Sequence, residues 1–549
     1  MTDDFQSLSN EIANDFIQSI VFIDDKAYST GEDQNHEFDA HAITKAFSKD
    51  KKICAIYKPE SKSDIRMFSQ IAEKADVTVI DWQIILSEHN IPVESLEEDD
   101  NDEIKGIYTK KIISDLLSSQ SNQNSLKLII IYTGDSNLTE IAIEINEHIK
   151  QSGIKKFTID EGDPCCVFSN SCRILVVTKS NGGAGRQKHN PSMIKNEVTY
   201  DELPKYISTE FTKMTNGLLS NFALQSLTVI RKNFHQILNI FSKELDTAYL
   251  THQSLLQTTD DANELLVELL GDTFTSILRY QNIHTSIDAS VLDSWVNKKI
   301  TNEDKYILNK DGTKTVAMYK RDKELILKLL KSNQDVKEKF KIALNASVTG
   351  EFPGFNNYIK KHALTIFSDE ANHKEINNNF AILCHHKNLV LHDNYLPNLS
   401  LGTVVKSTSD GKGYYVCIQQ RCDSIRMPKM GSRRFLFLPL SVVDDGSAFD
   451  FLTLSGDKLR LEKGDNGIKT FGLRTVKFSG SKDLLVKARK KIGRLFFYPH
   501  HFSKKIPEKF EFIFELKDLY AQRIVADYSA SLSRVGLDEP EWVRLNRSI

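Results

Sequence analysis

The stretch SIVFIDDKAY, Ser19–Tyr28, decides how the first part of this chain is interpreted. An apolar run from Ile20 to Ile23 leads directly to two adjacent carboxylates, Asp24 and Asp25. Carboxylates that lie side by side repel each other, and removing them from water costs free energy. We therefore expect a buried strand whose carboxyl end carries a site that needs these charges.

Short apolar runs alternate with helical patterns over residues 1–180. The runs are rich in Val, Ile and Tyr and are apolar on both faces, as in a parallel sheet that helices cover on both sides. The predicted strands are Ile20–Ile23, Ile53–Tyr57, Val77–Ile80, Leu128–Tyr132 and Ile174–Thr178, and the predicted helices cover residues 39–48, 63–75, 104–118 and 137–151. This alternation predicts a doubly wound α/β sheet.

Ligands of an open parallel sheet gather beyond the carboxyl ends of its strands. At these ends stand Asp24 and Asp25, Asp81 in VTVIDWQ, Thr133 in LIIIYTGD and Lys179 in RILVVTKSN. Clustered carboxylates are tolerated when they bind a hard divalent cation such as Mg²⁺. One carboxylate can then act as a nucleophile toward a phosphoryl donor, while the metal and an ammonium group neutralise charge on the transferring oxygens.

These residues, in this order and with the segments VIDW and TG, resemble the receiver domain of two-component response regulators over about residues 15–180. The resemblance implies a flavodoxin-like fold. It implies that Asp81 is the phosphoacceptor, that Asp24, Asp25 and Asp81 hold Mg²⁺, that Thr133 is the switch hydroxyl and that Lys179 pairs with the phosphate. It also implies a histidine kinase or a phosphotransfer protein as partner.

Several positions depart from the receiver pattern. The intervals between the site residues are wider than in compact receivers, so we expect insertions, one of them at the acidic tract ESLEEDDNDE, residues 94–103. Ser180 stands where receivers usually have proline, and Val176 stands where many carry the aromatic partner of the switch. The usual coupling between the hydroxyl and that aromatic side chain is therefore in question.

Two alternatives stay open at this point. The run IKKFTID, Ile154–Asp160, competes with Ile174–Thr178 for the place of the last strand, and Lys179 would lose its role if it won. Asp24 or Asp25, and Thr133, also fit the simpler interpretation of side chains that cap the following helix.

The remainder of the 549-residue chain changes character twice, so we expect several domains. A Gly- and Pro-containing linker over residues 181–191 separates a receiver-like domain, residues 1–185, from a helical domain, residues 195–397. The apolar stripe from Phe211 to Phe241 indicates a long helix in a central bundle. Short β-prone runs and a helix over about Leu516 to Leu532 indicate a basic, β-rich domain over residues 398–549. The predicted fold class is thus multidomain α/β plus α+β.

The net charge of −3 hides an asymmetry between the two ends of the chain. Residues 401–549 carry 27 Lys and Arg against 17 Asp and Glu, a net charge of +10, which leaves −13 for the other residues. The segments RMPKMGSRRFLF, KTFGLRTVKF and KARKKIGRLFFYPHHF interleave these cations with aromatic residues. This pattern is one footprint of nucleic-acid binding. Intramolecular docking of the basic domain on the acidic N-terminal part explains the charges equally well.

Other sites and locations receive weaker support from the sequence. The His and Cys residues with irregular spacing favour ordinary buried side chains over a zinc site; they are Cys384, His385, His386, His392, Cys417 and Cys422. Cys165, Cys166 and Cys172 are interpreted in the same way. Seven cysteines and no long apolar run favour a reducing cytoplasm and no membrane span.

The leading interpretation is an atypical bacterial response regulator whose receiver controls a large C-terminal output part, not a conventional enzyme beyond receiver phosphorylation. Large outputs of this kind resemble proteins of bacterial stress or antiphage defence signalling, by association only. The alternatives are a degenerate receiver that serves as a binding scaffold, and a nucleic-acid-binding effector that acts through the basic C-terminal domain.

Overall fold

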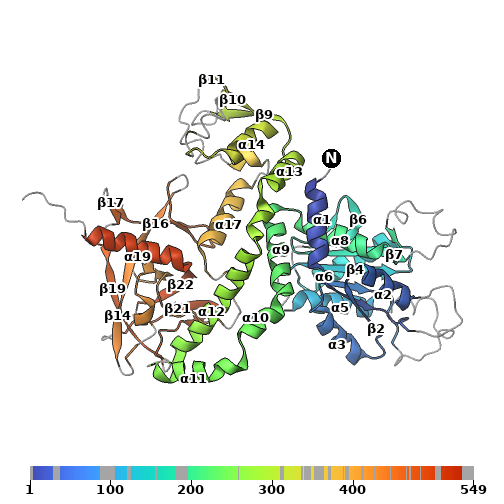
Figure 1. Cartoon of the computed structure of the whole chain (residues 1–549), viewed down its shortest axis with the longest axis horizontal. Helices are drawn as coiled ribbons and strands as arrows, with labels where there is room; N and C mark the ends of the chain where they lie inside the picture. The colour runs from blue at the N-terminus through green and yellow to red at the C-terminus, as the bar shows by residue number, and fades with distance from the viewer. Residues whose placement is uncertain are drawn as a thin grey trace, which may run out of the picture. The chain divides into compact units, whose positions relative to one another are not determined.

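The computed structural model divides into two compact units, Met1–Phe241 with Asp272–Lys299 and Ser242–Gly271 with Ile300–Ile549, which are described separately (Figure 1). The predicted division at residues 185, 195 and 397 into three domains remains a prediction. The structure describes residues 4–28, 38–86, 105–119, 125–154, 157–179, 196–256, 259–308, 315–335, 338, 348–350, 364–368, 372–387, 389, 395–409, 413–424, 427–428, 431–444, 447–464, 467–468, 472–481, 484–500 and 508–533. The acidic tract, the linker, Ser180 and His392 lie outside these residues.

The first unit is built on a sheet with the order β2-β1-β3-β4-β7-β6-β5. Five of its parallel strands confirm the predicted strands: β1 (Ser19–Ile23), β2 (Ile53–Tyr57), β3 (Val77–Ile80), β4 (Lys127–Thr133) and β7 (Cys172–Lys179). The antiparallel strands β6 (Asp163–Phe168) and β5 (Thr158–Asp160) extend the sheet beyond β7. The segment IKKFTID therefore contributes an edge strand, and Ile174–Thr178 holds the place beside β4.

Helices cover both faces of this sheet, because each strand alternates apolar side chains between two cores. One face packs against α3 (Lys62–Ala72), α5 (Ile107–Ser118) and α6 (Leu138–Gln151). The other packs against α1 (Asp4–Phe16), α2 (Ala40–Lys49), α8 (Leu203–Thr215) and α9 (Leu218–Lys232). The four predicted helices are confirmed, with α2, α3, α5 and α6 within a few residues of their expected bounds.

The prediction of one long helix between Phe211 and Phe241 is wrong. The stripe is divided among α8, α9 and α10 (Phe234–Ile240), with an extended Gly217 and a non-helical Asn233 at the breaks. Phe211 and Leu224 lie in the core beneath the sheet, whereas Phe234 and Phe241 are exposed. Periodic apolar residues can thus continue in phase through a helix break, because the pattern reports burial and not continuity.

The second unit contains the rest of the helical middle and the β-rich end. The middle comprises α11 (Asp246–Leu255), α12 (Thr259–Tyr280), which continues into the first unit, α14 (Lys323–Lys331) and α17 (His373–His385), with a small sheet of β9 (Glu303–Leu308), β10 (Thr315–Arg321) and β11 (Val348–Gly350). α13 (Ala289–Lys299) belongs to the first unit.

An antiparallel sheet with the order β15-β16-β14-β13-β12-β22-β21-β20 forms the C-terminal part, and β19 also pairs with β14. Its strands are β12 (Thr403–Ser407), β13 (Tyr414–Cys417), β14 (Ser432–Val443), β15 (Phe451–Leu452), β16 (Lys458–Leu461), β19 (Arg474–Ser479), β20 (Arg489–Lys491), β21 (Arg494–Phe497) and β22 (Phe510–Glu515). One core lies beneath α19 (Asp518–Ser533), which confirms the predicted C-terminal helix. A second core, rich in Phe, lies on the other side. Within the described part of the chain, no helix has the length and apolar character needed to cross a membrane.

Candidate functional site

The carboxyl ends of β1, β3 and β7 bring the predicted acids and the lysine to one edge of the sheet. The backbone fixes the ends of the strands, because Asp24 N–H donates to Tyr57 O at 3.1 Å and Asp81 N–H donates to Ile23 O at 2.9 Å. Carboxylate oxygens of Asp24, Asp25 and Asp81 all lie within 4.8 Å of one another. Side chains from distant parts of the sequence therefore form a single cluster.

Lys179 is the centre of this cluster. Its Nζ donates to Asp24 Oδ2 at 2.7 Å and to Asp81 Oδ1 at 3.0 Å. It also lies 5.6 Å from the ring centroid of Phe38 and 5.8 Å from that of Tyr132. Burial opposes the charge of Lys179, but the neighbouring carboxylates of Asp81 and Asp24 outweigh it and raise its pKa. The lysine is thus held as an ammonium group against two carboxylates.

The carboxyl of Asp81 is buried, and its pKa lies well above that of an ordinary Asp. Burial raises its pKa to about 7; Lys179 opposes the increase, and Asp24 and Asp25 add to it. Its main-chain carbonyl accepts a hydrogen bond of 2.7 Å from Thr109 Oγ1, which fixes the segment after β3. A carboxyl with such a pKa changes its proton occupancy under conditions in which an ordinary Asp is fully ionised.

Asp25 supplies an oxygen that has no partner. Its Oδ2 accepts Ile85 N–H at 3.1 Å, while its buried Oδ1 has no hydrogen-bond partner among the described residues. Burial, followed by the charge of Asp24, raises its pKa to about 6. Buried polar atoms are rarely left unsatisfied. An orphaned carboxylate oxygen within a cluster of three acids fits the oxygen ligands that Mg²⁺ prefers.

Thr133 stands at the carboxyl end of β4, on the strand next to β7. It is buried, and its Oγ1 accepts Asp135 N–H at 3.1 Å, which is a local turn contact. The N-cap of α6 is Asn137, so Thr133 does not cap that helix. Its switch role stays a prediction.

The sequence patterns did not point to Tyr132, the residue before Thr133. The Tyr132 hydroxyl donates to Val198 O at 2.7 Å, and its ring packs edge-on against Tyr200 at 5.9 Å. Val198 belongs to the short strand β8 (Glu197–Val198), which pairs with the end of β7 so that Val198 lies opposite Lys179. The aromatic residue in IIIYT was the available signal, but its partner lies 66 residues away.

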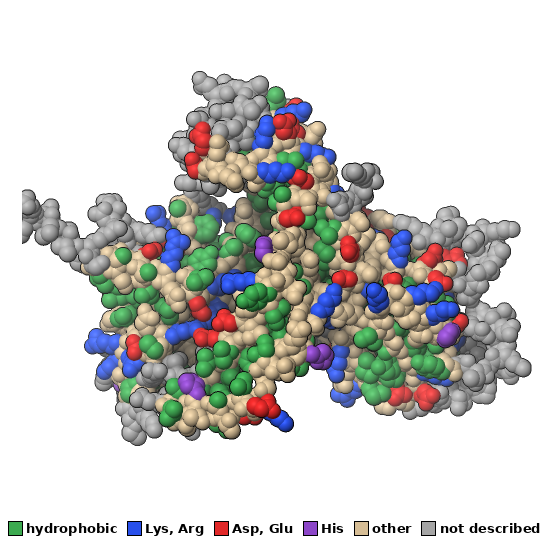
Figure 2. Space-filling view, viewed as in Figure 1, with side chains coloured by type: hydrophobic (Ala, Val, Ile, Leu, Met, Phe, Trp, Pro, Cys, Tyr) green, Lys and Arg blue, Asp and Glu red, His purple; other side chains and the backbone are tan. Residues whose placement is uncertain are grey.

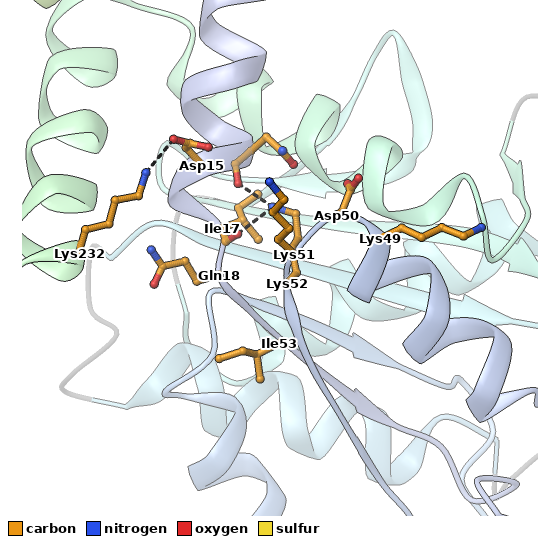
Figure 3. Close-up of a pocket in the computed structure, with 10 residues that line it drawn as sticks. Asp15, Ile17, Gln18, Lys49, Asp50, Lys51, Lys52, Ile53 and Lys232 are labelled. Atoms are coloured by element: carbon orange, nitrogen blue, oxygen red, sulfur yellow. Dashed lines mark hydrogen bonds and ion pairs between the residues drawn. The ribbon is translucent and has the colours of Figure 1, made fainter.

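A pocket of about 600 Å³ lies at the opposite, amino edge of the sheet (Figure 3). Its cations are Lys49, Lys51, Lys52 and Lys232, and its acids are Asp15 and Asp50. Figure 3 shows Lys52 directed at the end of α1, where its Nζ donates to Asn14 O at 2.6 Å and Ile17 O at 2.8 Å.

Most of these lysines have a structural explanation. Lys49 lies in the last turn of α2 and Lys232 in the last turn of α9, where cations offset the negative end of the helix dipole. Lys232 also pairs with Asp15 at 3.1 Å. The pocket is therefore interpreted as a junction of three helix ends, not as an anion site.

The adjacent histidines at the end of α17, His385 and His386, also have structural contacts. His385 Nε2 accepts Leu452 N–H at 3.1 Å, and the His386 ring stacks on Phe514 with centroids 4.0 Å apart. Burial lowers the pKa of His385 to about 4. Among the described residues the one group of potential metal ligands is Asp24, Asp25 and Asp81, so the zinc interpretation gains no support.

In the comparison with protein families, residues 16–184 match the model of the response receiver domain family, which covers under a third of the chain. Neither the curated proteins nor the solved structures compared with the chain include a match. The N-terminal part is therefore a receiver domain, as the sequence predicted, and supports a phosphorelay role of the response-regulator kind. Receiver domains generally interact with kinases or phosphotransfer proteins and bind Mg²⁺ through acidic residues.

Proposed function

We propose that this protein is an atypical response regulator that accepts a phosphoryl group on Asp81. A carboxylate oxygen of Asp81 forms the new P–O bond, and the P–N bond of a phosphohistidine on a kinase or phosphotransfer protein breaks. The imidazole of the donor leaves with the electron pair and takes up a proton. The observation that carries the proposal is the buried cluster in which Lys179 Nζ contacts both Asp24 and Asp81.

The residues that would hold Mg²⁺ are Asp24, Asp25 and Asp81. When bound, the cation would neutralise negative charge on the transferring phosphoryl oxygens. The unpartnered Oδ1 of Asp25 supports this assignment, because it is a buried acceptor with no donor among the described residues. With all three carboxyls ionised, the cluster and the ammonium group of Lys179 sum to a charge of −2, which a divalent cation balances.

Lys179 would exchange partners during the reaction. Before phosphorylation its ammonium group contacts Asp24 and Asp81. Once Asp81 carries a phosphoryl group as an acyl phosphate, the phosphoryl oxygens become the strongest nearby acceptors for the ammonium group of Lys179. Thr133, one strand away, would donate its hydroxyl to the same phosphoryl group.

The output would respond through the β4 and β7 side of the sheet. Lys179 pairs with Val198 in the β7–β8 ladder, and the Tyr132 hydroxyl holds the carbonyl of Val198. α8 begins at Leu203, shortly after this strand. A shift of Lys179 toward a phosphoryl group would therefore strain the segment that leads out of the receiver. We propose a cytoplasmic setting, with bacterial stress or antiphage signalling as an analogy only.

The test is phosphorylation of the full chain by acetyl phosphate, with and without Mg²⁺, followed by intact mass. The expected result is a Mg²⁺-dependent, acid-labile gain of one phosphoryl group that Asp81→Asn abolishes. The matched control Asp201→Asn changes an exposed acid of the same unit and should label normally.

If Asp81→Asn still gains a phosphoryl group, the phosphoacceptor is a residue other than Asp81. Absence of labelling by acetyl phosphate and by every histidine kinase tried, together with no Mg²⁺ binding, would favour a degenerate receiver that acts as a scaffold.

A further inference from the structure

The strands β20 and β21 form a tight basic hairpin at the end of the C-terminal sheet. Lys491 pairs with Arg494, and the two residues between them, Ile492 and Gly493, have φ of 49° and 73°. Such a turn matches the right-handed twist of the strands and lets the ribbon project. The tip is open to solvent, since Ile492 is 92% exposed.

Positive charge dominates this ribbon and its surroundings. From Gly472 to His500 the chain has eight Lys and Arg and one acid, Asp483. Arg489, Lys491 and Arg494 of the hairpin are exposed. Lys and Arg side chains are also visible on the side of the C-terminal sheet where β14 and β19 lie (Figure 2).

An aromatic ring lies among these cations. Arg489 lies 5.5 Å and Lys509 lies 5.8 Å from the ring centroid of Tyr498, which is half-buried. His500 N–H donates to Lys477 O at 2.7 Å, so the chain after β21 runs beside β19. We call the set Arg489, Lys491, Arg494, Tyr498 and Lys509 the hairpin surface.

Nearby acids do not cancel the charge of the hairpin surface. Glu511 approaches Arg494 at 3.5 Å, but Arg494 keeps 69% of its side chain exposed. Glu508 is occupied by Arg474 at 2.6 Å and by the Ser409 hydroxyl at 3.0 Å. The set therefore presents an excess of cations to solvent.

We propose that the hairpin surface binds single-stranded nucleic acid, with its cations on the phosphates and Tyr498 against a base. Cations that follow the backbone and an aromatic ring that stacks on a base are the two elements of such binding. Charged residues on an edge strand such as β20 also prevent sheets from associating. That explanation accounts for Arg489 and Lys491 but not for Arg494 on the inner strand or for Lys509 beside Tyr498. The inference is independent of phosphorylation at Asp81.

The experiment measures anisotropy of a fluorescent oligo(dT) of about 16 nucleotides with the full chain, between about 50 and about 200 mM NaCl. The wild-type protein should bind with an affinity that falls steeply with salt, because bound cations release counterions. Lys491→Gln/Arg494→Gln should weaken binding about 5- to 30-fold and reduce the slope of log K against log salt by about 1.4, at about 0.7 per phosphate contact.

Two further variants make the test specific. Arg460→Gln/Arg523→Gln removes the same charge from exposed positions on β16 and α19 and should bind like the wild type. Tyr498→Ser should reduce oligo(dT) binding by at least about 5-fold while leaving affinity for a duplex of equal length unchanged. Melting temperatures of all variants confirm that the fold is retained.

Three outcomes overturn the proposal. One is absence of oligo(dT) binding by the wild type. Another is equal loss in the hairpin and control variants, which would indicate a general effect of net charge. The third is hairpin-dependent binding to vesicles of anionic lipid in place of oligo(dT), which would assign the exposed Ile492 tip to a membrane surface.

Discussion

Lys179 Nζ lies 2.7 Å from Asp24 Oδ2, although the two residues are 155 positions apart and lie at the carboxyl ends of strands, β7 and β1, that are not neighbours. The contact spans β3 and β4, which lie between β1 and β7 in the sheet. It places one ammonium group beside the buried carboxylates of Asp24 and Asp81 and the half-buried one of Asp25, so the cluster keeps an excess negative charge. That excess is the physical reason why the cluster favours both a cation and a proton.

Lys179→Ala should uncouple phosphorylation from the rest of the domain. Lys179 is the cation whose backbone pairs with Val198 of β8. Without its ammonium group, the phosphoryl group on Asp81 has no such link to β8. We expect Mg²⁺ binding to change less than about 3-fold, while the phosphorylation-dependent change in hydrogen exchange of residues 196–215 is lost. Lys205→Ala, on the exposed face of α8, is the control. A change that persists in Lys179→Ala would show that the signal leaves the site by another route.

Asp25→Asn should weaken Mg²⁺ binding and should stabilise the metal-free protein. The folded pKa of about 6 lies above the ordinary value of 3.8, so the folded state binds more protons between these pH values. Stability therefore falls as pH rises through this window, and the charged carboxyl destabilises the fold above it. At about pH 8 without metal, the variant should be more stable by about 1–3 kcal/mol, and the gain should fade below about pH 4.

Mg²⁺ provides the complementary measurement for Asp25→Asn. At about 100 times its Kd, a ligand stabilises the folded state by about 2.7 kcal/mol. The melting temperature of the wild type should therefore rise with Mg²⁺, and that of Asp25→Asn should rise much less. An equal Mg²⁺ response in the two proteins would exclude Asp25 as a ligand.

Tyr132→Phe tests the link between the site and β8. The substitution removes the 2.7 Å hydrogen bond to Val198 O and leaves a buried carbonyl without its donor, at a cost of about 1–2 kcal/mol. Phosphorylation of Asp81 should remain near the wild-type level, while hydrogen exchange at residues 196–200 becomes faster. Tyr206→Phe removes a hydroxyl from α8 without affecting this bond and serves as the control. Unchanged exchange in Tyr132→Phe would mean that β8 is held by its strand pairing alone.

The local sequence pattern was sufficient to predict the parallel sheet and the position of the acids at its strand ends. Each parallel strand is a short apolar run with a polar residue at its carboxyl end, so the sequence alone places Asp24, Asp81 and Lys179 at strand ends. Their convergence follows from parallel strand direction, which the alternating helices imply. The roles of these residues in phosphoryl transfer remain predictions.

What the sequence did not reveal depends on contacts distant in sequence. β6 is a short antiparallel strand that is placed by pairing with β7, and β5 is placed by pairing with β6. The contact of Tyr132 depends on β8 returning beside β7. The stripe from Phe211 to Phe241 kept its apolar spacing across Gly217, so its division into three helices was missed. In the C-terminal part, the sequence indicated short β-prone runs but not β22, and the order of the strands depends on long-range pairing such as β12 with β22.

His385 should make the contact between α17 and β15 sensitive to acid. Burial, followed by the proximity of His386, lowers the pKa of His385 to about 4, below the ordinary 6.5. The unfolded state therefore binds more protons between these values, so stability is fully present above about pH 6.5 and declines toward about pH 4. Protonation also removes the acceptor for Leu452 N–H. The expected loss of stability is about 1–2 kcal/mol, seen as faster hydrogen exchange in residues 373–386 and 451–452 at about pH 5 after correction for intrinsic rates.

The control variant His385→Gln keeps an acceptor that does not titrate, so it should remove most of this pH dependence. The remainder is due to His386, because burial also lowers its pKa. If His385→Gln shows the full pH dependence of the wild type, the acid sensitivity belongs to other groups and His385 is a neutral packing residue.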